Sequence, residues 1–458
     1  MTSVNQKLSR WKDSVREYLF DVSGRSRNDG KAWSQARLRR EIEACVEAPR
    51  GEMDARKRAA EIGAAYAVAE APERKRILAL LVDEFGPVME KVDAAIEVYR
   101  QAGEQGAGVD SAAASLREAL RPRRVDLLTR FTSLPDGMKF LVDMREELLA
   151  FIREDEGLRP LDADMRGLFR LWFDQGFLDI ERITWSSSAS LLEKLMDYEA
   201  IHSIVSWEDL KNRLDRDRRC YTVFHPRMPG EPLAILHVAL TTGIATNIQS
   251  LLDVQAPPLA AAEADTAVFY SVTSPQRGLR GISFGEYIIK EAVKQLRSEL
   301  PDLKTFVTLS PVPGFRLWLE KNLEDGELDN LPFAADALFS VLERVAGGEE
   351  SDWLPTLEAF MHRKCLEYLT TLQRGRPVNP VTRFHLRNGA SIHRINFMGD
   401  RSANGLRSAC GMMVNYGYNL KTLETNLAKY HEGQLPVSGK LLRTARGEKL
   451  PVGHLVTG

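Results

Sequence analysis

The sequence predicts a two-domain α+β protein, in which an all-α domain is followed by an α/β domain. Three observations predict it. Early apolar residues recur at three- and four-residue spacing, later ones form short β-branched and aromatic runs, and the pattern changes at ERITWSSSAS (181–190). The 458 residues also exceed what one ordinary core organises. We therefore assign residues 1–184 to a helical domain and residues 185–458 to an α/β domain.

The helical half shows amphipathic segments separated by helix breakers. Segment 74–102 carries Ile77, Leu80 and Leu81 on one face, and segment 138–154 repeats the pattern. Breakers such as Gly86-Pro87 and Pro135-Asp136-Gly137 interrupt the periodicity. No segment before residue 184 shows the alternation of a strand, so we expect a purely helical bundle here.

The second half predicts an α/β unit. An amphipathic helix over 283–301 lies between two strand-like runs, which predicts a βαβ crossover joining neighbouring strands. Helices return over 330–376, and the tail from Asn379 mixes short strands with loops. The runs that predict strands are 219–226, 231–240, 266–274 and 304–315.

Composition excludes several classes of protein. A net charge of −2 gives no general reason to expect a nucleic-acid partner. The four cysteines include no C-x-x-C pair, so neither a zinc site nor a disulfide framework is indicated, and reduced thiols favour the cytoplasm. No run approaches about 18 uninterrupted apolar residues, so no membrane span is expected. These cysteines are Cys45, Cys220, Cys365 and Cys410.

The most informative local pattern is a glycine-containing loop between a strand and a helix, SVTSPQRGLRGISFGEYII (271–289). Glycines let main chain approach a ligand closely, and the free amides of a helix N-terminus hold phosphate. Arg277 and Arg280 can pair with the same anion. The residues alone also fit an ordinary strand-to-helix turn with solvated arginines. The loop resembles the acyl-CoA pyrophosphate loop of GNAT acetyltransferases, with Gly281-Ile282-Ser283 as its Gly-x-small part and Gly278 where Arg or Gln is usual.

Longer blocks carry a more specific resemblance. TLSPVPGF (308–315), NPVTRFHLRNGA (379–390) and CGMMVNYGY (410–418) resemble segments of the malonyl-CoA decarboxylase family. The resemblance extends over nearly all of residues 180–418. It implies that residues 1–184 assemble a homo-oligomer, a homotetramer, and that residues 185–458 form a GNAT-like catalytic domain. It also implies conversion of malonyl-CoA to acetyl-CoA and carbon dioxide without a metal or cofactor, the coenzyme A thioester being the substrate.

The resemblance also implies roles for individual residues. Ser310 and His385 are the expected catalytic pair: Ser310 bonds the malonyl carboxylate, and His385, as an imidazolium, protonates the carbanion. Pro311 predicts that the strand diverges from its neighbour there, since proline removes a ladder donor. The expected substrate-binding residues are Ser271, Arg280, Gly281, Ile282, Ser283, Phe284, Gly285, Glu286 and Tyr418, with Asn415 as a weaker supporting candidate.

Without the resemblance, other interpretations stay open. Ser310 equally fits a serine capping a turn before proline, and His385 a strand histidine bonded to a backbone carbonyl. Two alternative functions are a GNAT-type acyl-CoA N-acyltransferase, which needs an amine acceptor, and a non-catalytic CoA-binding protein. Release of carbon dioxide from malonyl-CoA alone separates the decarboxylase from both.

Overall fold

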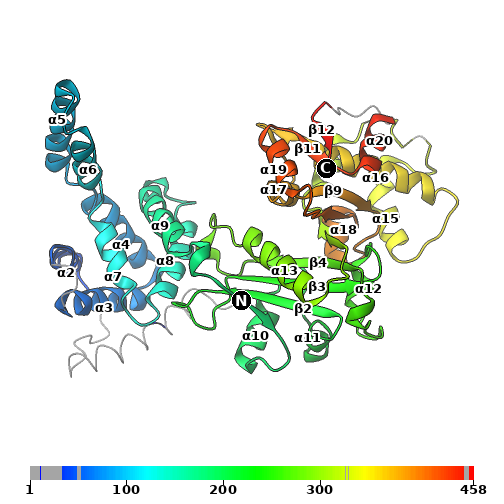
Figure 1. Cartoon of the computed structure of the whole chain (residues 1–458), viewed down its shortest axis with the longest axis horizontal. Coiled ribbons are helices and arrows are strands. Elements are labelled where there is room, and N and C mark those ends of the chain that lie inside the picture. Colours follow the sequence, from blue (N-terminus) through cyan, green and yellow to red (C-terminus); the bar gives the residue numbers. More distant parts are fainter. Residues whose placement is uncertain (1–10, 12–32, 49–52, 325, 329, 448–452) are drawn as a thin grey trace. The chain divides into compact units, whose positions relative to one another are not determined.

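The chain divides into two compact units (Figure 1). The computed structural model describes residues 11, 33–48, 53–324, 326–328, 330–447 and 453–458. The helical unit comprises Met1–Asp179 with two later excursions, Phe224–Leu233 and Ser274–Ser283. The sheet unit comprises Ile180–Val223, Ala234–Thr273 and Phe284–Gly458. The chain first leaves the helical unit after Asp179 and then returns to it twice.

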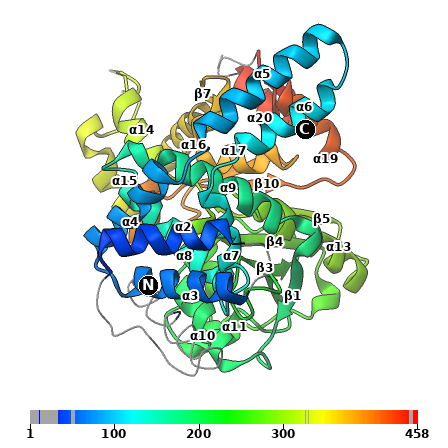
Figure 2. The ribbon, with the colours of Figure 1, turned by 90° about the vertical axis from the view of Figure 1, so that its left-hand side faces the viewer.

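Amphipathic segments form the helical unit, as predicted. Helix α4 ends at Glu84 and α5 begins at Met89, so Gly86-Pro87 separates them. Figure 2 shows α2 and α3 side by side in blue. The described helices are α2 (Gln35–Glu47), α3 (Met53–Val68), α4 (Ala71–Glu84), α5 (Met89–Gln105), α6 (Val109–Ala119), α7 (Arg124–Phe131), α8 (Gly137–Phe151) and α9 (Arg159–Trp172).

Helix α8 contributes many buried residues to the helical unit. Phe140, Leu141 and Leu148 have no exposed surface. Its polar residue Glu147 is also buried, and it accepts hydrogen bonds from Arg74 and from the Tyr66 hydroxyl at 2.7 Å. Buried charge is tolerated when it is paired and fully bonded in this way. Buried apolar contacts and the hydrogen bonds of Glu147 thus hold helix α8 in place in the helical unit.

A mixed sheet organises the other unit, in the order β1-β2-β3-β4-β5-β10-β9-β11-β12, with the short β6 paired to β10. Strands β2, β3 and β4 are antiparallel, β4 and β5 are parallel, and β10 is antiparallel to both β5 and β9. The bounds are β1 (Asp179–Ile183), β2 (Arg218–Phe224), β3 (Ala234–Thr241), β4 (Thr266–Thr273), β5 (Thr305–Thr308), β6 (Ser310–Pro311), β9 (Ser391–Asn396), β10 (Met413–Gly417), β11 (Leu435–Val437) and β12 (Leu455–Thr457).

The predicted βαβ unit is confirmed. Helix α13 (Gly285–Glu299) connects β4 to the parallel, neighbouring β5, and it buries one apolar face that includes Ile288, Ala292 and Leu296. The remaining helices of this unit are α10 (Ala189–Tyr198), α11 (Trp207–Asn212), α12 (Ile248–Leu252), α14 (Phe315–Asn322), α15 (Leu338–Ala346), α16 (Leu354–Thr370), α17 (Pro380–Arg387), α18 (Ala403–Ala409), α19 (Leu423–His431) and α20 (Gly439–Gly447).

Strands β4 and β5 part where Pro311 predicted a divergence. Their parallel pairing ends at Phe269 and Thr308. One residue later the chain resumes as β6, which pairs with β10 through Ser310 opposite Val414. The side chain of Ser310 therefore emerges where the central strands separate.

The predicted fold class, a helical domain followed by an α/β domain, is confirmed, with two local corrections. Strand β1 lies inside residues 1–184, where only helices were expected. It is an edge strand with one buried residue, Ile183, so it lacks the apolar alternation that marks a strand. The segment around His385 was expected to be strand or loop, and it is helix α17.

Candidate active site

Ser310 and His385, 75 residues apart in sequence, meet in the sheet unit. The hydroxyl Oγ of Ser310 lies 3.2 Å from Nε2 of His385. Both residues are buried, with 7% and 3% of their surface exposed. The structure therefore brings the predicted pair into hydrogen-bond contact.

Local sequence explains why His385 lies on a helix. Asn379 caps α17, its side-chain oxygen accepting the amide of Thr382 at 2.8 Å. Pro380 follows at the first helical position, where its fixed φ favours a helix start. The imidazole of His385 then stacks on the ring of Tyr416, with 4.4 Å between centroids. The Asn-Pro pair was the available sequence signal for this helix.

Tyr418 bonds the other edge of the imidazole. Its hydroxyl lies 2.8 Å from Nδ1 of His385. Burial raises the pKa of Tyr418, so it stays a protonated phenol. Sequence reasoning placed Tyr418 beside Ser310 or the substrate carboxylate, whereas in the structure its hydroxyl contacts His385.

Thr308 is a supporting residue that sequence reasoning missed. Its hydroxyl oxygen accepts the Ser310 hydroxyl at 2.9 Å and the Tyr416 amide at 3.0 Å. With the Ser310 proton directed to Thr308, the Ser310 oxygen accepts from Nε2–H of His385, and Nδ1 accepts from Tyr418. A threonine two residues before the serine, on the same strand face, was the available signal.

The environment of His385 favours the neutral imidazole. Burial lowers the pKa of His385 from 6.5 to about 3, because the charged form loses its hydration. The sequence led us to expect an imidazolium as the proton donor, and burial disfavours that form in the free protein.

Asn415 supports the strands around this pair. It has no exposed surface, and its amide donates to the carbonyls of Thr308 at 2.7 Å and Ala245 at 3.0 Å. Its side-chain oxygen accepts from Asn396 at 2.8 Å. These bonds fix the main chain beneath Thr308 and occupy the Asn415 amide.

Ser271 lies in a different buried cluster. Its hydroxyl contacts both carboxylate oxygens of Glu199, at 2.9 and 2.8 Å. The same carboxylate accepts the amides of Ile201 and His202, and it lies 3.5 Å from Nε2 of His237. Burial lowers the pKa of His237. These contacts do not join Ser271 to Ser310 and His385.

The residues of the predicted anion-binding stretch, Arg280–Glu286, differ in how exposed they are. Arg280, Gly281 and Ser283 are exposed, and Gly281 has the left-handed φ of +88° that suits glycine. Ile282 and Glu286 are half-buried, and Glu286 pairs with Lys290 at 2.7 Å. The exposed residues are available to a ligand.

Phe284 and Gly285 are buried packing residues. A Cβ on Gly285 would lie 2.5 Å from the ring of Phe384, which adjoins His385 in α17. Glycine therefore permits the start of α13 to lie against the helix that carries His385.

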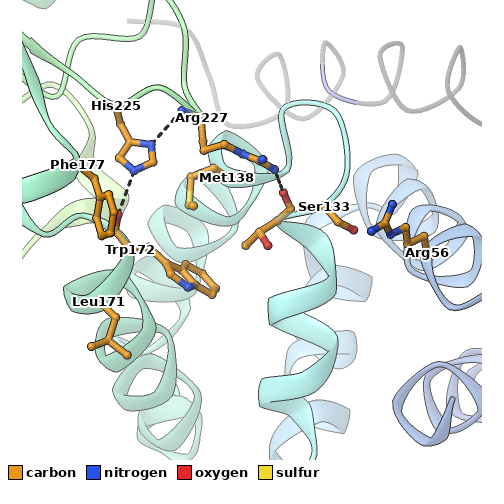
Figure 3. A pocket seen from close by; sticks show the side chains of 9 residues that line it. Arg56, Ser133, Met138, Leu171, Trp172, Phe177, His225 and Arg227 are labelled. Atoms are coloured by element: carbon orange, nitrogen blue, oxygen red, sulfur yellow. Dashed lines mark hydrogen bonds between the residues drawn. The ribbon is translucent and has the colours of Figure 1, made fainter. Parts of the chain in front are cut away.

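A groove in the helical unit has a different character (Figure 3). It encloses about 560 Å³ and is lined by Arg56, Thr132, Ser133, Met138, Leu171, Trp172, Phe177, His225 and Arg227. His225 bonds the Trp172 carbonyl through Nε2 and accepts the Arg227 amide through Nδ1. Both nitrogens are thus engaged with main chain, which indicates a structural role for His225.

Across the described ranges, no group of three or more His, Cys, Asp and Glu side chains is arranged to hold a metal ion. Among the helices in those same ranges, none has the length and apolar character to cross a membrane. The four cysteines are buried free thiols.

Comparisons with known proteins match both parts of the chain. The malonyl-CoA decarboxylase N-terminal domain matches residues 85–173, and the malonyl-CoA decarboxylase C-terminal domain matches residues 176–450. The mitochondrial malonyl-CoA decarboxylase of Anser anser anser is 37% identical over 408 residues, covering 82% of this chain and 80% of that protein. The mitochondrial enzyme of Mus musculus is 36% identical over 392 residues, covering 79% and 80%.

Solved structures of malonyl-CoA decarboxylases are also similar to this chain. The malonyl-CoA decarboxylase of Rhodopseudomonas palustris is 38% identical with a TM-score of 0.78, covering 89% of this chain and 99% of that one. That of Agrobacterium vitis is 39% identical with a TM-score of 0.80, covering 88% and 98%. Because the domain matches follow in the same order and the relatives align over most of their length, this chain belongs to the malonyl-CoA decarboxylase family.

Proposed function

We propose that this protein decarboxylates malonyl-CoA to acetyl-CoA and carbon dioxide, with Ser310 and His385 acting on the malonyl group. Membership of the family supports the reaction. The observation that carries the assignment of residues is the 3.2 Å contact between Ser310 Oγ and His385 Nε2 in a buried setting.

The chemistry requires an acceptor for one electron pair and a source of one proton. As the carbon–carbon bond to the carboxylate breaks, its electrons move into the thioester carbonyl and carbon dioxide leaves. The resulting enolate is stabilised by oriented donors in a poorly hydrated site. Its carbon then takes up one proton to give the acetyl group. Ser310 and His385 provide an O–H and an N–H at one place.

The low pKa of His385 fits a proton that is taken up from solvent when the substrate binds. In the free protein the imidazole is neutral because it is buried. A malonyl carboxylate bound beside it introduces a negative charge, which raises the pKa of His385. The imidazolium formed then gives its proton to the enolate carbon, and the pKa falls again once carbon dioxide has left. Tyr418 holds the ring in place through Nδ1.

The second part of the proposal assigns the stretch Arg280–Glu286 to the phosphates of coenzyme A. Gly281 is exposed in a conformation that leaves main chain accessible, and Arg280 is exposed beside it. The first amides of α13 follow directly, and a helix N-terminus attracts phosphate. Phe284 and Gly285 are buried, so their role in this stretch is to pack against neighbouring residues.

The decisive experiment supplies malonyl-CoA alone and measures carbon dioxide release. We expect release without any amine, and His385→Ala and Ser310→Ala should each lower kcat by about a hundredfold or more. Binding of acetyl-CoA, measured by calorimetry, should survive in both variants. Near-normal kcat in His385→Ala would remove His385 from the mechanism, and turnover only with an amine would favour an acyltransferase.

We also propose that the reaction needs no metal or prosthetic group, because hydrogen-bond donors can stabilise the enolate. Protein dialysed against EDTA should retain its kcat. Loss of activity that added Mg²⁺ or Zn²⁺ restores would contradict this proposal.

A homotetramer and a cytoplasmic location complete the proposal. The family resemblance supports the assembly, and light scattering coupled to size-exclusion chromatography measures its mass. The four buried free thiols are consistent with a reducing compartment, although the goose and mouse relatives are named as mitochondrial. Fractionation of the native host with antibody detection tests the location.

A further inference from the structure

A buried arginine of α8 donates hydrogen bonds to the loop that precedes α13. Arg145 is among the largest fully buried side chains. Its Nη1 donates to the carbonyls of Gly278 at 2.6 Å and Arg280 at 3.0 Å, and its Nε donates to Asp162 at 2.8 Å. One side chain of the helical unit thus fixes two peptide groups of the loop.

Two further contacts hold the same loop. A Cβ on Gly278 would lie 1.8 Å from the carbonyl oxygen of Val142, so only glycine allows the loop to lie this close to α8. The amide of Gln276 donates to the carbonyl of Pro232 at 3.0 Å, in the other excursion of the helical unit. Residues of the helical unit therefore fix the conformation of this loop.

The bond from Arg145 to the Arg280 carbonyl determines where the next amide points. In a trans peptide the N–H lies opposite to the C=O. Since the Arg280 carbonyl faces Arg145, the N–H of Gly281 faces away from it. Gly281 is exposed, and within the described ranges no protein acceptor takes this N–H.

A second arginine of the helical unit lies beside Gly281. The Cδ of Arg166, on α9, is 3.9 Å from where a Cβ of Gly281 would stand. Arg166 and Arg280 are both exposed. No carboxylate within 4 Å pairs with either guanidinium in the part of the chain that the structure describes. Two cations and an outward amide therefore surround Gly281, which is a setting for a phosphate group.

We propose that α8, α9 and the loop 274–283 form a coenzyme A diphosphate site within the helical unit: Arg166 contacts the diphosphate, and Arg145 is a positioning residue that directs the Gly281 amide toward it. This inference rests on the proposed binding of coenzyme A by Arg280–Glu286. It gives the N-terminal helices a role in substrate recognition besides the assembly role expected from sequence.

The test compares substrates with and without the diphosphate. For Arg145→Met and Arg166→Gln, KM for malonyl-CoA should rise by about tenfold while kcat changes by less than about twofold, since uniform binding is lost. Arg145→Lys, which keeps the charge and one donor, should recover part of the loss. With malonyl-pantetheine, which lacks the phosphates, the variants should match the wild type.

A matched control is available in Arg124. It is equally buried, pairs with Asp164 of α9 at 2.7 Å, and donates to the carbonyls of Leu81 and Val82. Arg124→Met removes the same kind of contacts away from the loop, so any defect should be equal for both substrates.

Three results would overturn the inference. One is an Arg145→Met defect of equal size with malonyl-pantetheine, which would mark a purely structural role. Another is an unchanged KM for malonyl-CoA in Arg166→Gln, which folds readily as a surface variant. The third is a defect that disappears with malonyl-3′-dephospho-CoA, which would assign the anion to the 3′-phosphate. Failure of the wild type to decarboxylate either substrate would instead reject the proposed function.

Discussion

The hydroxyl of Tyr418 lies 2.8 Å from Nδ1 of His385, on the opposite edge of the ring from Ser310. The imidazole is therefore held at both nitrogens. Because the Ser310 hydroxyl donates to Thr308, Nε2 carries the proton directed at Ser310, and Nδ1 accepts from Tyr418. A ring held in one tautomer is prepared for proton transfer without reorientation.

Removing the Tyr418 hydroxyl should impair turnover more than binding. In Tyr418→Phe, Nδ1 loses its donor and the ring loses one of its two hydrogen bonds, so we expect kcat to fall by about tenfold or more with little change in KM. Tyr430→Phe is the control, since Tyr430 is half-buried beside His431 in α19. A kcat for Tyr418→Phe equal to that of the control would show that Tyr418 does not position His385.

The buried neutral His385 should make the protein less stable in mild acid. Its folded-state pKa of about 3 lies below the ordinary 6.5, so the unfolded chain binds the extra proton between these values. The stability is complete above pH 6.5 and is lost as pH falls toward 3, by up to about 1.4 kcal/mol per pH unit.

Urea unfolding of wild type and His385→Gln between pH 7.5 and 5 measures this effect. The free energy of unfolding should fall less steeply with acidification in the variant, which has lost one titrating group. Identical slopes would mean that His385 titrates normally in the folded protein.

Adding a methyl group at Gly285 should disturb the site through Phe384. In Gly285→Ala the new Cβ would lie 2.5 Å from the Phe384 ring, which must shift beside His385. We expect a destabilisation of about 1–3 kcal/mol and a lower kcat. The double variant Gly285→Ala/Phe384→Leu should recover activity, since the shorter side chain leaves room.

The control for this change is Gly167→Ala in α9, where a Cβ would meet no atom within 4 Å. It should stabilise the helix by about 0.5–1 kcal/mol. No recovery in the double variant would show that the loss in Gly285→Ala arises elsewhere than at Phe384.

Substitution of Ser271 distinguishes the structural role that its contacts indicate from the substrate-binding role expected from sequence. Ser271→Ala leaves the buried Glu199 carboxylate without its hydroxyl donor, so we expect a loss of about 1–3 kcal/mol in stability with an unchanged KM. Ser115→Ala, on the exposed face of α6, should change neither quantity. A raised KM with unchanged stability would instead support substrate contact by Ser271.

Much of the fold follows from local patterns in the sequence. Helix α13 between two strand-like runs predicted the parallel pairing of β4 with β5, and Gly86-Pro87 predicted the break between α4 and α5. Strand β1 escaped prediction because an edge strand buries too few side chains to show alternation.

The site was only partly predictable. Ser310 and His385 came from resemblance, since no local pattern links residues on β6 and on α17. The bonds from Thr308 and Arg145 depend on tertiary contacts, and those of Arg145 span more than 130 residues. Sequence periodicity reports which face of an element is buried and is silent about such distant partners.

The order of segments along the chain limits how the protein can be divided. The helical unit is completed by Phe224–Leu233 and Ser274–Ser283, which are synthesised after parts of the sheet unit. A fragment ending at residue 184 would lack the loop that lies against Val142 and satisfies Arg145, leaving a guanidinium without its carbonyl acceptors. Neither unit is thus encoded by one continuous stretch, and expression of the helices alone should yield an incomplete, poorly soluble product.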